Sequence, residues 1–319
     1  MKKVLIVAPE YMGYIVKVAD ELRKNENIEV TDIHIPTYKY SSQSLKIKNF
    51  FYKTFAKDIK FKFREDYIKK IIKNDTFDLV LIIRPDMFSV TTLTDLKSRT
   101  KSFKTYFFDG VSRFPKKKKR IHLFDEIYSF EPSDCKAFGF KFITNFIYEL
   151  EEPSNTRDLP LKHTVFNITS YDRKRFPILL KIAKVLKKQK NVFKIIVKTS
   201  KPIPSNDFIE IIENPISLED VKLYIKQSAC MLDLGVVEKH KGLTFRVFEA
   251  IGYHKKIITN NPEIATYDFY NPQNILIIDE HNIAIPNSFL NSSYVPISDE
   301  IIRKYTLETW VTTVFKEVI

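Results

Sequence analysis

The segment KGLTFRVFEAIGYHKKIITNN, residues 241–261, begins with residue types that bind anions. Gly242 lets a ligand approach the backbone closely, because it has no side chain. If a helix begins directly after it, the backbone N–H groups of Leu243, Thr244 and Phe245 have no partners within the helix and can bind a phosphate. The segment therefore predicts a phosphate-binding helix start.

Arg246 and Glu249 follow Gly242 by four and seven residues, so in a helix they lie on the face that begins at the glycine. The apolar residues between them would pack against a sheet. The planar guanidinium of Arg246 suits a diphosphate, and the carboxylate of Glu249 can accept hydrogen bonds from two sugar hydroxyls. A surface ion pair that only supports the helix is the simpler alternative.

Short apolar runs that alternate with helical patterns precede and follow this segment. Runs such as VLIVAP from residue 4 and DLVLIIRP from residue 78 lack polar alternation, which is typical of parallel strands covered on both faces. A polar stretch with two prolines separates two series of such runs. We therefore expect two α/β domains, 1–152 and 163–297, joined by a linker at 153–162 and followed by an amphipathic helical segment at 298–319.

Length and charge agree with this division. A chain of 319 residues with 44% hydrophobic residues exceeds the size at which one core usually divides. Its net charge of +13 favours an anionic partner, such as nucleic acid, a phospholipid surface or a phosphorylated small molecule, although a biased base composition explains the charge equally well. The two cysteines lie far apart, and a reducing cytoplasm suits them.

Several kinds of site lack the residues that they need. The six glycines never form the spacing of a dinucleotide-binding or P-loop motif, and the six histidines never fall at metal-ligand spacing. Aspartates do not occur as Asp-x-Asp, so we expect no metal site. No apolar stretch is long enough to span a bilayer, and any membrane contact should be peripheral.

Two stretches carry a family resemblance: SYDRKRFPILLKIAKVL at 170–186, and SACMLDLG through NPQNILIID at 228–279. They resemble the C-terminal half of bacterial glycosyltransferase-like proteins from lipopolysaccharide-core and capsule clusters, a group similar to CgeB-like proteins. The resemblance is specific over roughly residues 163–280. It implies an α/β fold of GT-B architecture, with two facing Rossmann-like domains, a nucleotide-sugar held mainly by the second, and a C-terminal amphipathic helix.

The resemblance also implies which residues bind the donor nucleotide-sugar, without a cofactor or a metal. GT-B enzymes commonly place diphosphate-binding basic residues in the helix after the first strand of the second domain, which implies Arg173 here, with solvated surface charge as the alternative. The other donor-binding residues would be Gly242, Leu243, Thr244, Arg246, Glu249, Asn260 and Asn261. Many retaining GT-B enzymes carry a second glutamate eight positions before the one matching Glu249, where this chain has Lys241.

An inverting transfer needs a general base near the acceptor hydroxyl. Asp109, which follows the predicted strand KTYFF, is the first choice, because Gly110 permits a turn there. Asp86 and Glu131 are the other catalytic candidates, and for each of the three an Asx turn or helix cap is the structural alternative. Tyr11 and Tyr14, in the first loop, can stack against acceptor sugar rings or simply pack.

Residues 45–64, LKIKNFFYKTFAKDIKFKFR, combine basic and aromatic residues with a single acid. This composition suits an anionic membrane surface, where aromatic side chains insert and lysines stay among the headgroups. It also suits RNA or a solvated helix, but nucleic acid is not the expected partner. We expect a cytoplasmic protein, peripheral at the inner face of the cell membrane.

These features together predict a metal-independent glycosyltransferase. It would move a sugar from a nucleotide-sugar to a surface polysaccharide or a lipid-linked glycan, with inversion and a carboxylate general base. A nucleotide-sugar epimerase of GT-B fold is one alternative. A non-catalytic binding or scaffold protein is the other, favoured by Lys241.

Overall fold

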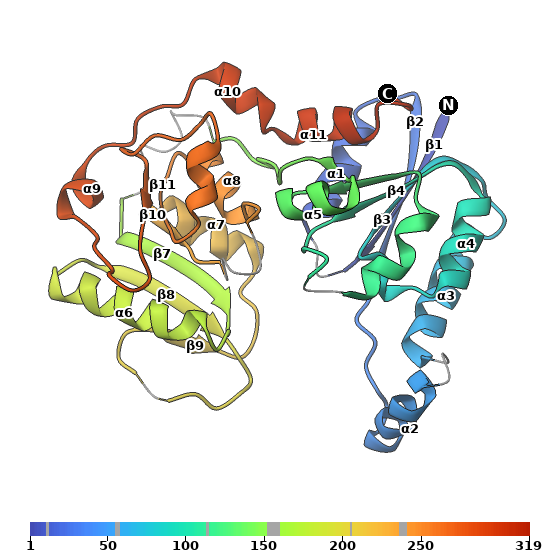
Figure 1. Cartoon of the computed structure of the whole chain (residues 1–319), viewed down its shortest axis with the longest axis horizontal. Coiled ribbons are helices and arrows are strands. Elements are labelled where there is room, and N and C mark those ends of the chain that lie inside the picture. The colour runs from blue at the N-terminus through green and yellow to red at the C-terminus, as the bar shows by residue number, and fades with distance from the viewer. Residues whose placement is uncertain (11–12, 55–57, 113–114, 152–159, 205, 236–240) are drawn as a thin grey trace. The chain divides into compact units, whose positions relative to one another are not determined.

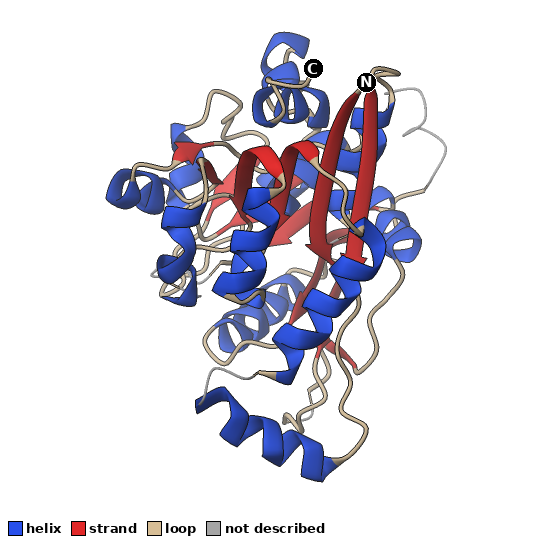
Figure 2. Ribbon diagram, turned by 90° about the vertical axis from the view of Figure 1, so that its right-hand side faces the viewer, coloured by secondary structure: helices blue, strands red, loops and turns tan. Residues whose placement is uncertain are grey.

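The computed structural model describes residues 1–10, 13–54, 58–112, 115–151, 160–204, 206–235 and 241–319. The chain divides into two compact units: Met1–Thr144 with Leu307–Ile319 forms the first, and Asn145–Thr306 forms the second. Within the described residues each unit contains one six-stranded sheet with helices around it (Figures 1 and 2).

The sheet of the first unit is parallel and has the strand order β2-β1-β3-β4-β5-β6. Its central strands form from apolar runs that are buried on both faces, since every side chain from Val4 to Ala8 and from Leu79 to Ile83 is inaccessible to solvent. The strands are β1 (Lys2–Pro9), β2 (Ile28–Ile35), β3 (Phe77–Ile83), β4 (Thr100–Phe107), β5 (Glu126–Ser129) and β6 (Lys141–Phe142).

Helices cover both faces of this sheet (Figure 1). Helices α3 (Ile59–Ile72) and α4 (Val90–Ser98) share one core with a face of the strands. On the other face, α1 (Tyr14–Arg23) packs against α11 (Leu307–Val314). The remaining elements are α2 (Gln43–Thr54), α5 (Pro132–Phe138) and the 3₁₀ turns η1 (Pro85–Met87) and η2 (Pro115–Leu123). None of the described helices is both long enough and apolar enough to cross a membrane.

A buried lysine attaches the end of the chain to the first unit. Lys104, in β4, is inaccessible to solvent, and its Nζ donates to the carbonyl of Val314 at 2.8 Å. The same ammonium forms ion pairs with Glu126 at 3.0 Å and Glu317 at 2.6 Å. Because removing one partner of a buried charge is costly, this network fixes α11 on the sheet. The predicted helical segment 298–319 is thereby split, with α10 (Asp299–Lys304) in the second unit.

The sheet of the second unit is also parallel and has the order β12-β11-β10-β7-β8-β9. Its strands are β7 (His163–Ser170), β8 (Phe193–Lys198), β9 (Glu210–Ile212), β10 (Ser228–Asp233), β11 (Lys256–Thr259) and β12 (Ile275–Ile277). Helices α6 (Arg175–Lys188) and α9 (Asn287–Asn291) share a core with one face. On the other face lie α7 (Leu218–Lys226), α8 (Phe245–Gly252), α10 and the turn η3 (Pro262–Thr266).

The architecture confirms the predicted α/β class with two parallel sheets, but the units divide earlier than the predicted linker, of which residues 153–159 lie outside the described residues. Residues 145–151 belong to the second unit because they pack on α8 and beside α10, where Ile147 N–H donates to Tyr305 at 2.8 Å and Glu151 N–H donates to Gly252 at 2.9 Å.

Candidate functional site

The strand order of the second unit creates a topological switch point between β7 and β10. The chain continues from β7 to β8 and β9 on one side, and from β10 to β11 and β12 on the other. The helices after these two strands, α6 and α8, accordingly lie on opposite faces of the sheet. Open parallel sheets bind ligands in the crevice beyond the carboxyl ends of such strands, so the site should lie beyond Ser170 and Asp233.

Arg175, the first residue of α6, connects these two strand ends. Its guanidinium donates to the carbonyl of Ser170 at 2.7 Å and to that of Leu234 at 3.2 Å. The carboxylate of Asp172 accepts the backbone N–H groups of Lys174 at 2.9 Å and Arg175 at 3.1 Å. Because these donors at the helix start are satisfied, α6 begins at the switch point with its basic residues held in place.

Helix α8 begins at the end of β10. Thr244 caps it: its hydroxyl oxygen accepts the N–H of Arg246 at 3.2 Å and donates to Asp233 at 2.9 Å. Burial raises the pKa of Asp233, and the nearby Arg246, the Thr244 hydroxyl and Arg175 oppose this rise. Two arginines and one buried aspartate therefore surround the crevice.

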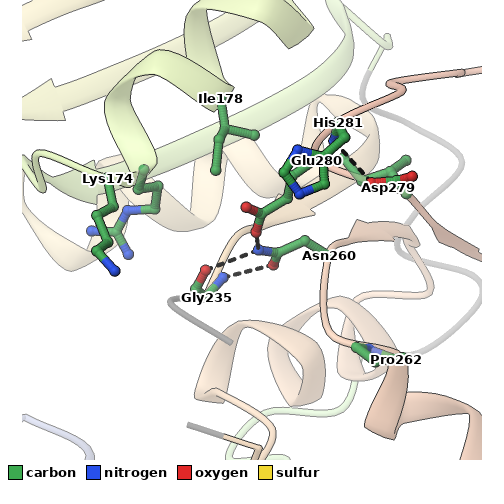
Figure 3. A pocket seen from close by; sticks show the side chains of 10 residues that line it. Lys174, Ile178, Gly235, Asn260, Pro262, Asp279, Glu280 and His281 are labelled. Carbon is green, nitrogen blue, oxygen red and sulfur yellow. Dashed lines mark hydrogen bonds between the residues drawn. The ribbon is translucent and has the colours of Figure 1, made fainter. Parts of the chain in front are cut away.

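A pocket of about 460 Å³ opens at the same edge, a size typical of small-molecule sites (Figure 3). It extends from the start of α6 past the ends of β10, β11 and β12. Lys174 and Arg175 contribute positive charge to it, and Asp279 and Glu280 contribute negative charge. Its lining consists of Lys174, Arg175, Ile178, Gly235, Asn260, Pro262, Ile278, Asp279, Glu280 and His281.

Two asparagines at the end of β11 hold the loops around this pocket. The side chain of Asn260 accepts the N–H of Gly235 and donates to its carbonyl, both at 2.9 Å, and it also donates to Glu280 (Figure 3). Asn261 donates to the carbonyl of Lys241 at 2.9 Å and caps η3. In this state the side chains predicted to bind sugar hydroxyls organise the walls of the pocket.

The first unit gathers acids at the carboxyl edge of its own sheet. Asp86, Asp109 and Glu131 follow the adjacent strands β3, β4 and β5. Arg84 donates to both carboxylate oxygens of Asp86, at 2.9 and 2.8 Å, and its Nη1 lies 3.9 Å from Asp109. Arg84 has a φ of 61°, which is unfavourable for a residue with a side chain and is typical of functional loops. Glu131 is buried and accepts the Ser133 hydroxyl at 2.8 Å.

In the described part of the chain, potential metal ligands lie apart and neither thiol is exposed. No three His, Cys, Asp or Glu side chains there come together as a metal site requires. Both cysteines are free, and burial raises the pKa of Cys135 and Cys230 to about 11. Neither is a nucleophilic thiolate near neutral pH.

No protein-family model and no curated protein sequence matches the chain. Solved structures do. The N-terminal domain of Candida albicans trehalose-6-phosphate phosphatase superposes with a TM-score of 0.62 at 10% identity, over 100% of this chain and 96% of that one. A UDP-forming trehalose-phosphate synthase from Burkholderia xenovorans gives 0.55 at 10% identity, over 100% and 99%. The chain has the GT-B fold. The UDP-GlcNAc 2-epimerase from Neisseria meningitidis gives 0.52 at 12% identity, over 100% and 99%.

The predicted helix start of this GT-B chain is shifted slightly along the sequence. Thr244 is the cap, and α8 begins at Phe245, so the first N–H groups of the helix lie beyond Leu243. Gly242 and Leu243 precede the helix as buried residues, and the Leu243 carbonyl accepts the Asn145 side chain at 2.8 Å. The helix therefore starts two residues later than Leu243, the first residue of the predicted start, and Gly242 lies before it.

Glu249 is buried, unlike the partly exposed Arg246 with which it was expected to share a ligand-binding face. Its carboxylate accepts the hydroxyl of Tyr148 at 2.9 Å. The reason is tertiary, because residues 145–151 pack over this part of α8. A direct contact of Glu249 with a sugar remains a prediction.

The other predicted site residues have mixed positions. Arg173 is exposed, and the residues of α6 that line the pocket are its neighbours Lys174 and Arg175. Tyr14 is the first residue of α1 and is partly buried. Tyr11 lies outside the described residues.

Sequence reasoning missed three residues at the pocket edge: Asp233, Arg175 and Glu280. Asp233 is the one charged residue in the run SACMLDLG, and a lone acid at the end of a buried strand is a usable signal. Glu280 follows the strand NILII in the same way. Arg175 had no distinguishing signal, because it stands beside two other basic residues.

Proposed function

We propose that this chain is a glycosyltransferase that uses a nucleotide-sugar as its donor. The observation that carries the proposal is the crevice at the switch point of the second sheet, where Arg175 and Arg246 stand at the starts of two helices beside a pocket of about 460 Å³. Guanidinium groups at helix starts bind phosphate groups through both their charge and their hydrogen bonds.

The donor diphosphate would bind at this crevice. Arg246 and Arg175 would hold its oxygens, with Lys174 and the exposed Arg173 supplying further positive charge. The first turn of α8, with Thr244, would contribute backbone N–H groups. The nucleoside or the sugar would occupy the adjacent pocket, whose polar walls contain Glu280 and Asn260. Fixed cations can stabilise the leaving diphosphate without a divalent metal.

Transfer would proceed with inversion. The carboxylate of Asp109 removes the proton from the acceptor hydroxyl. At the same time the acceptor oxygen forms a bond with the anomeric carbon, and the bond from that carbon to the diphosphate breaks. Asp109, directly beyond the end of β4, is the proposed base, and Arg84 engages both carboxylate oxygens of its neighbour Asp86. Lys241, where a retaining enzyme would carry a glutamate, also favours inversion.

The acceptor would be a growing surface polysaccharide or a lipid-linked glycan, of the kind assembled for lipopolysaccharide core or capsule. Tyr14 and Tyr11 would contact the acceptor sugar. Such acceptors are presented at the inner face of the cell membrane, so the enzyme would act in the cytoplasm at that surface.

An epimerase is the second candidate, since nucleotide-sugar epimerases have the same fold. The acids in and beside the pocket, Asp279, Glu280 and Asp233, are the groups on which that chemistry would depend. A scaffold protein that has lost its donor site is the third.

Thermal-shift measurements with UDP-, GDP-, TDP- and CMP-sugars test the proposal. A ligand present at 100 times its Kd should stabilise the fold by about 2.7 kcal/mol. The bound donor is then incubated with and without candidate acceptors. Acceptor-dependent release of the nucleoside diphosphate supports transfer, a donor isomerised without acceptor supports the epimerase, and no shift with any nucleotide would refute both enzymes.

A further inference from the structure

Helix α2 exposes an apolar face to solvent. Ile47, Phe50 and Phe51 are 61%, 73% and 61% exposed. Their spacing of three and four residues places them side by side on one face of the helix. A helix on the surface of a soluble protein normally turns such a face toward the core, and an exposed apolar cluster marks an interaction site.

The orientation of α2 is fixed from its opposite side. Asn49 is inaccessible to solvent, and its side-chain amide donates to the Tyr40 hydroxyl at 2.8 Å and to Asp58 at 3.0 Å. Its carbonyl oxygen accepts the N–H of Ile59 at 2.9 Å. Because a buried asparagine is costly to leave without its partners, the helix cannot rotate to bury the phenylalanines without breaking these bonds.

Positive charge flanks the apolar face. Lys46 and Lys48 are exposed and lie about 100° to either side of it along the helix. Between residues 33 and 57 the sequence contains no aspartate or glutamate. The next acid, Asp58, caps α3 and binds Asn49. An apolar centre with lysines on both sides complements an anionic lipid surface, in which apolar side chains enter the acyl boundary and ammonium groups meet phosphates.

Helix α2 lies at the carboxyl edge of the first sheet. The chain enters it from the end of β2, and Figures 1 and 2 show it protruding from the end of the unit opposite to the two termini. Helix α3, which follows, passes beside the ends of the strands, where Arg64 donates to the carbonyl of Met87 at 2.6 Å. Asp86 and Asp109 belong to the same edge.

We propose that α2 docks this protein on an anionic lipid surface, with Ile47, Phe50 and Phe51 inserted and Lys46 and Lys48 among the headgroups. Docking there brings the edge that carries Asp109 close to the lipid, where a lipid-linked acceptor would be. Only this last link depends on the proposed function. Isoleucine cannot stack on a nucleic-acid base as an aromatic ring does, so the composition of the face favours lipid over RNA.

Co-sedimentation of the full chain with vesicles tests the docking. Wild type should bind vesicles that contain phosphatidylglycerol, bind pure phosphatidylcholine far less, and release as salt rises. The double substitution Phe50→Ser and Phe51→Ser should weaken vesicle binding at least about tenfold, because it removes the two rings that would insert into the lipid. Lys46→Ser and Lys48→Ser should each weaken it about fivefold. The matched control is Phe142→Ser, which alters an exposed phenylalanine in β6 and should bind as wild type does.

A second measurement locates the face directly. The fluorescence of Phe51→Trp should be quenched by lipids brominated in their acyl chains. The quenching should exceed that of wild type, whose Trp310 is buried. Wild-type binding by the double variant, or an introduced indole that the brominated lipids leave unquenched, would overturn the proposal. RNA that competes with vesicles for the protein would also overturn it, since α2 would then contact RNA. So would a wild-type dimer that binds no vesicles and that becomes a monomer in the double variant, since α2 would then contact a second copy. None of these results bears on donor binding, which is measured separately.

Discussion

The two units place opposite charges at equivalent edges of similar sheets. Beyond the ends of the strands in the second unit stand Arg175 and Arg246, with Asp233 buried beneath them. Beyond those of the first unit stand Asp86 and Asp109, with Arg84 between them. In each of these two clusters, one group lies beside two groups of the opposite charge. The comparison shows that one architecture can carry either an edge with paired arginines or an edge with paired carboxylates.

The strand orders also differ. The second unit has the strand order of the Rossmann fold. Its first strand, β7, lies in the centre, with β8 and β9 on one side and β10, β11 and β12 on the other. In the first unit β1 lies between β2 and β3, so its switch point is displaced by one strand. The pocket is found at the switch point of the second unit. Binding and base catalysis are therefore expected to depend on different edges.

Asp109→Asn should have the largest effect. Loss of a general base costs about 10²- to 10⁴-fold in kcat, while the affinity for the donor nucleotide should not change. Kinetics with a saturating donor and calorimetry with the nucleotide give the two quantities. Asp78→Asn, at the opposite edge of the same sheet, is the matched control and should keep its kcat. Equal turnover in wild type and Asp109→Asn would contradict the assignment of the first edge.

Arg246→Ala should lower the affinity for the donor nucleotide. Removal of a guanidinium that binds phosphate costs about 1.5–3 kcal/mol, which weakens nucleotide affinity about 10- to 100-fold. Lys187→Ala, which removes a positive charge near the far end of α6, should bind nucleotide as wild type does. If Arg246→Ala unfolds more readily yet binds the nucleotide normally, Arg246 has a structural role and the contrast between the two edges fails.

Gly252→Ala should destabilise the second unit by about 1–3 kcal/mol. A Cβ there would lie 2.4 Å from the carbonyl oxygen of Glu149 and 2.8 Å from the Ile147 side chain, so the segment over α8 would have to move. Gly13→Ala, in the first unit, would meet nothing within 4 Å and should change stability little. Urea denaturation of the two variants measures the difference, and equal stabilities would show that this segment is not tightly packed.

The smallest effect concerns Asp233. Burial raises the pKa of Asp233 above its ordinary value of 3.8, so at a pH between the two values the folded chain binds a proton that the unfolded chain releases. Its contribution therefore favours folding at low pH and is lost as pH rises through the raised pKa. The stability of Asp233→Asn relative to wild type should increase as the pH is raised from the ordinary pKa of 3.8 toward neutrality. Urea denaturation across this range measures it; parallel profiles would show that Asp233 is not perturbed.

Local patterns predicted much of the fold and part of the site. Apolar runs gave most of the strands because a parallel strand buries both of its faces, and they placed Asp109 and Asp86 at strand ends correctly. The start of α8 was predicted within a few residues, since glycine and threonine are read locally. Arg175 was not distinguished from Arg173, because which neighbour turns toward β10 depends on a strand about sixty residues away.

By itself the sequence determined that two parallel sheets form, that basic and acidic side chains follow their strands, and which residues share a helix face. Periodicity is a local property, so local physics suffices for these. Only the tertiary structure decided which faces are covered. The segment 145–151 buries Glu249 and holds it to Tyr148, and Asn49 holds α2 with its phenylalanines outward. Both outcomes depend on packing partners outside the helix concerned, which its periodicity does not specify.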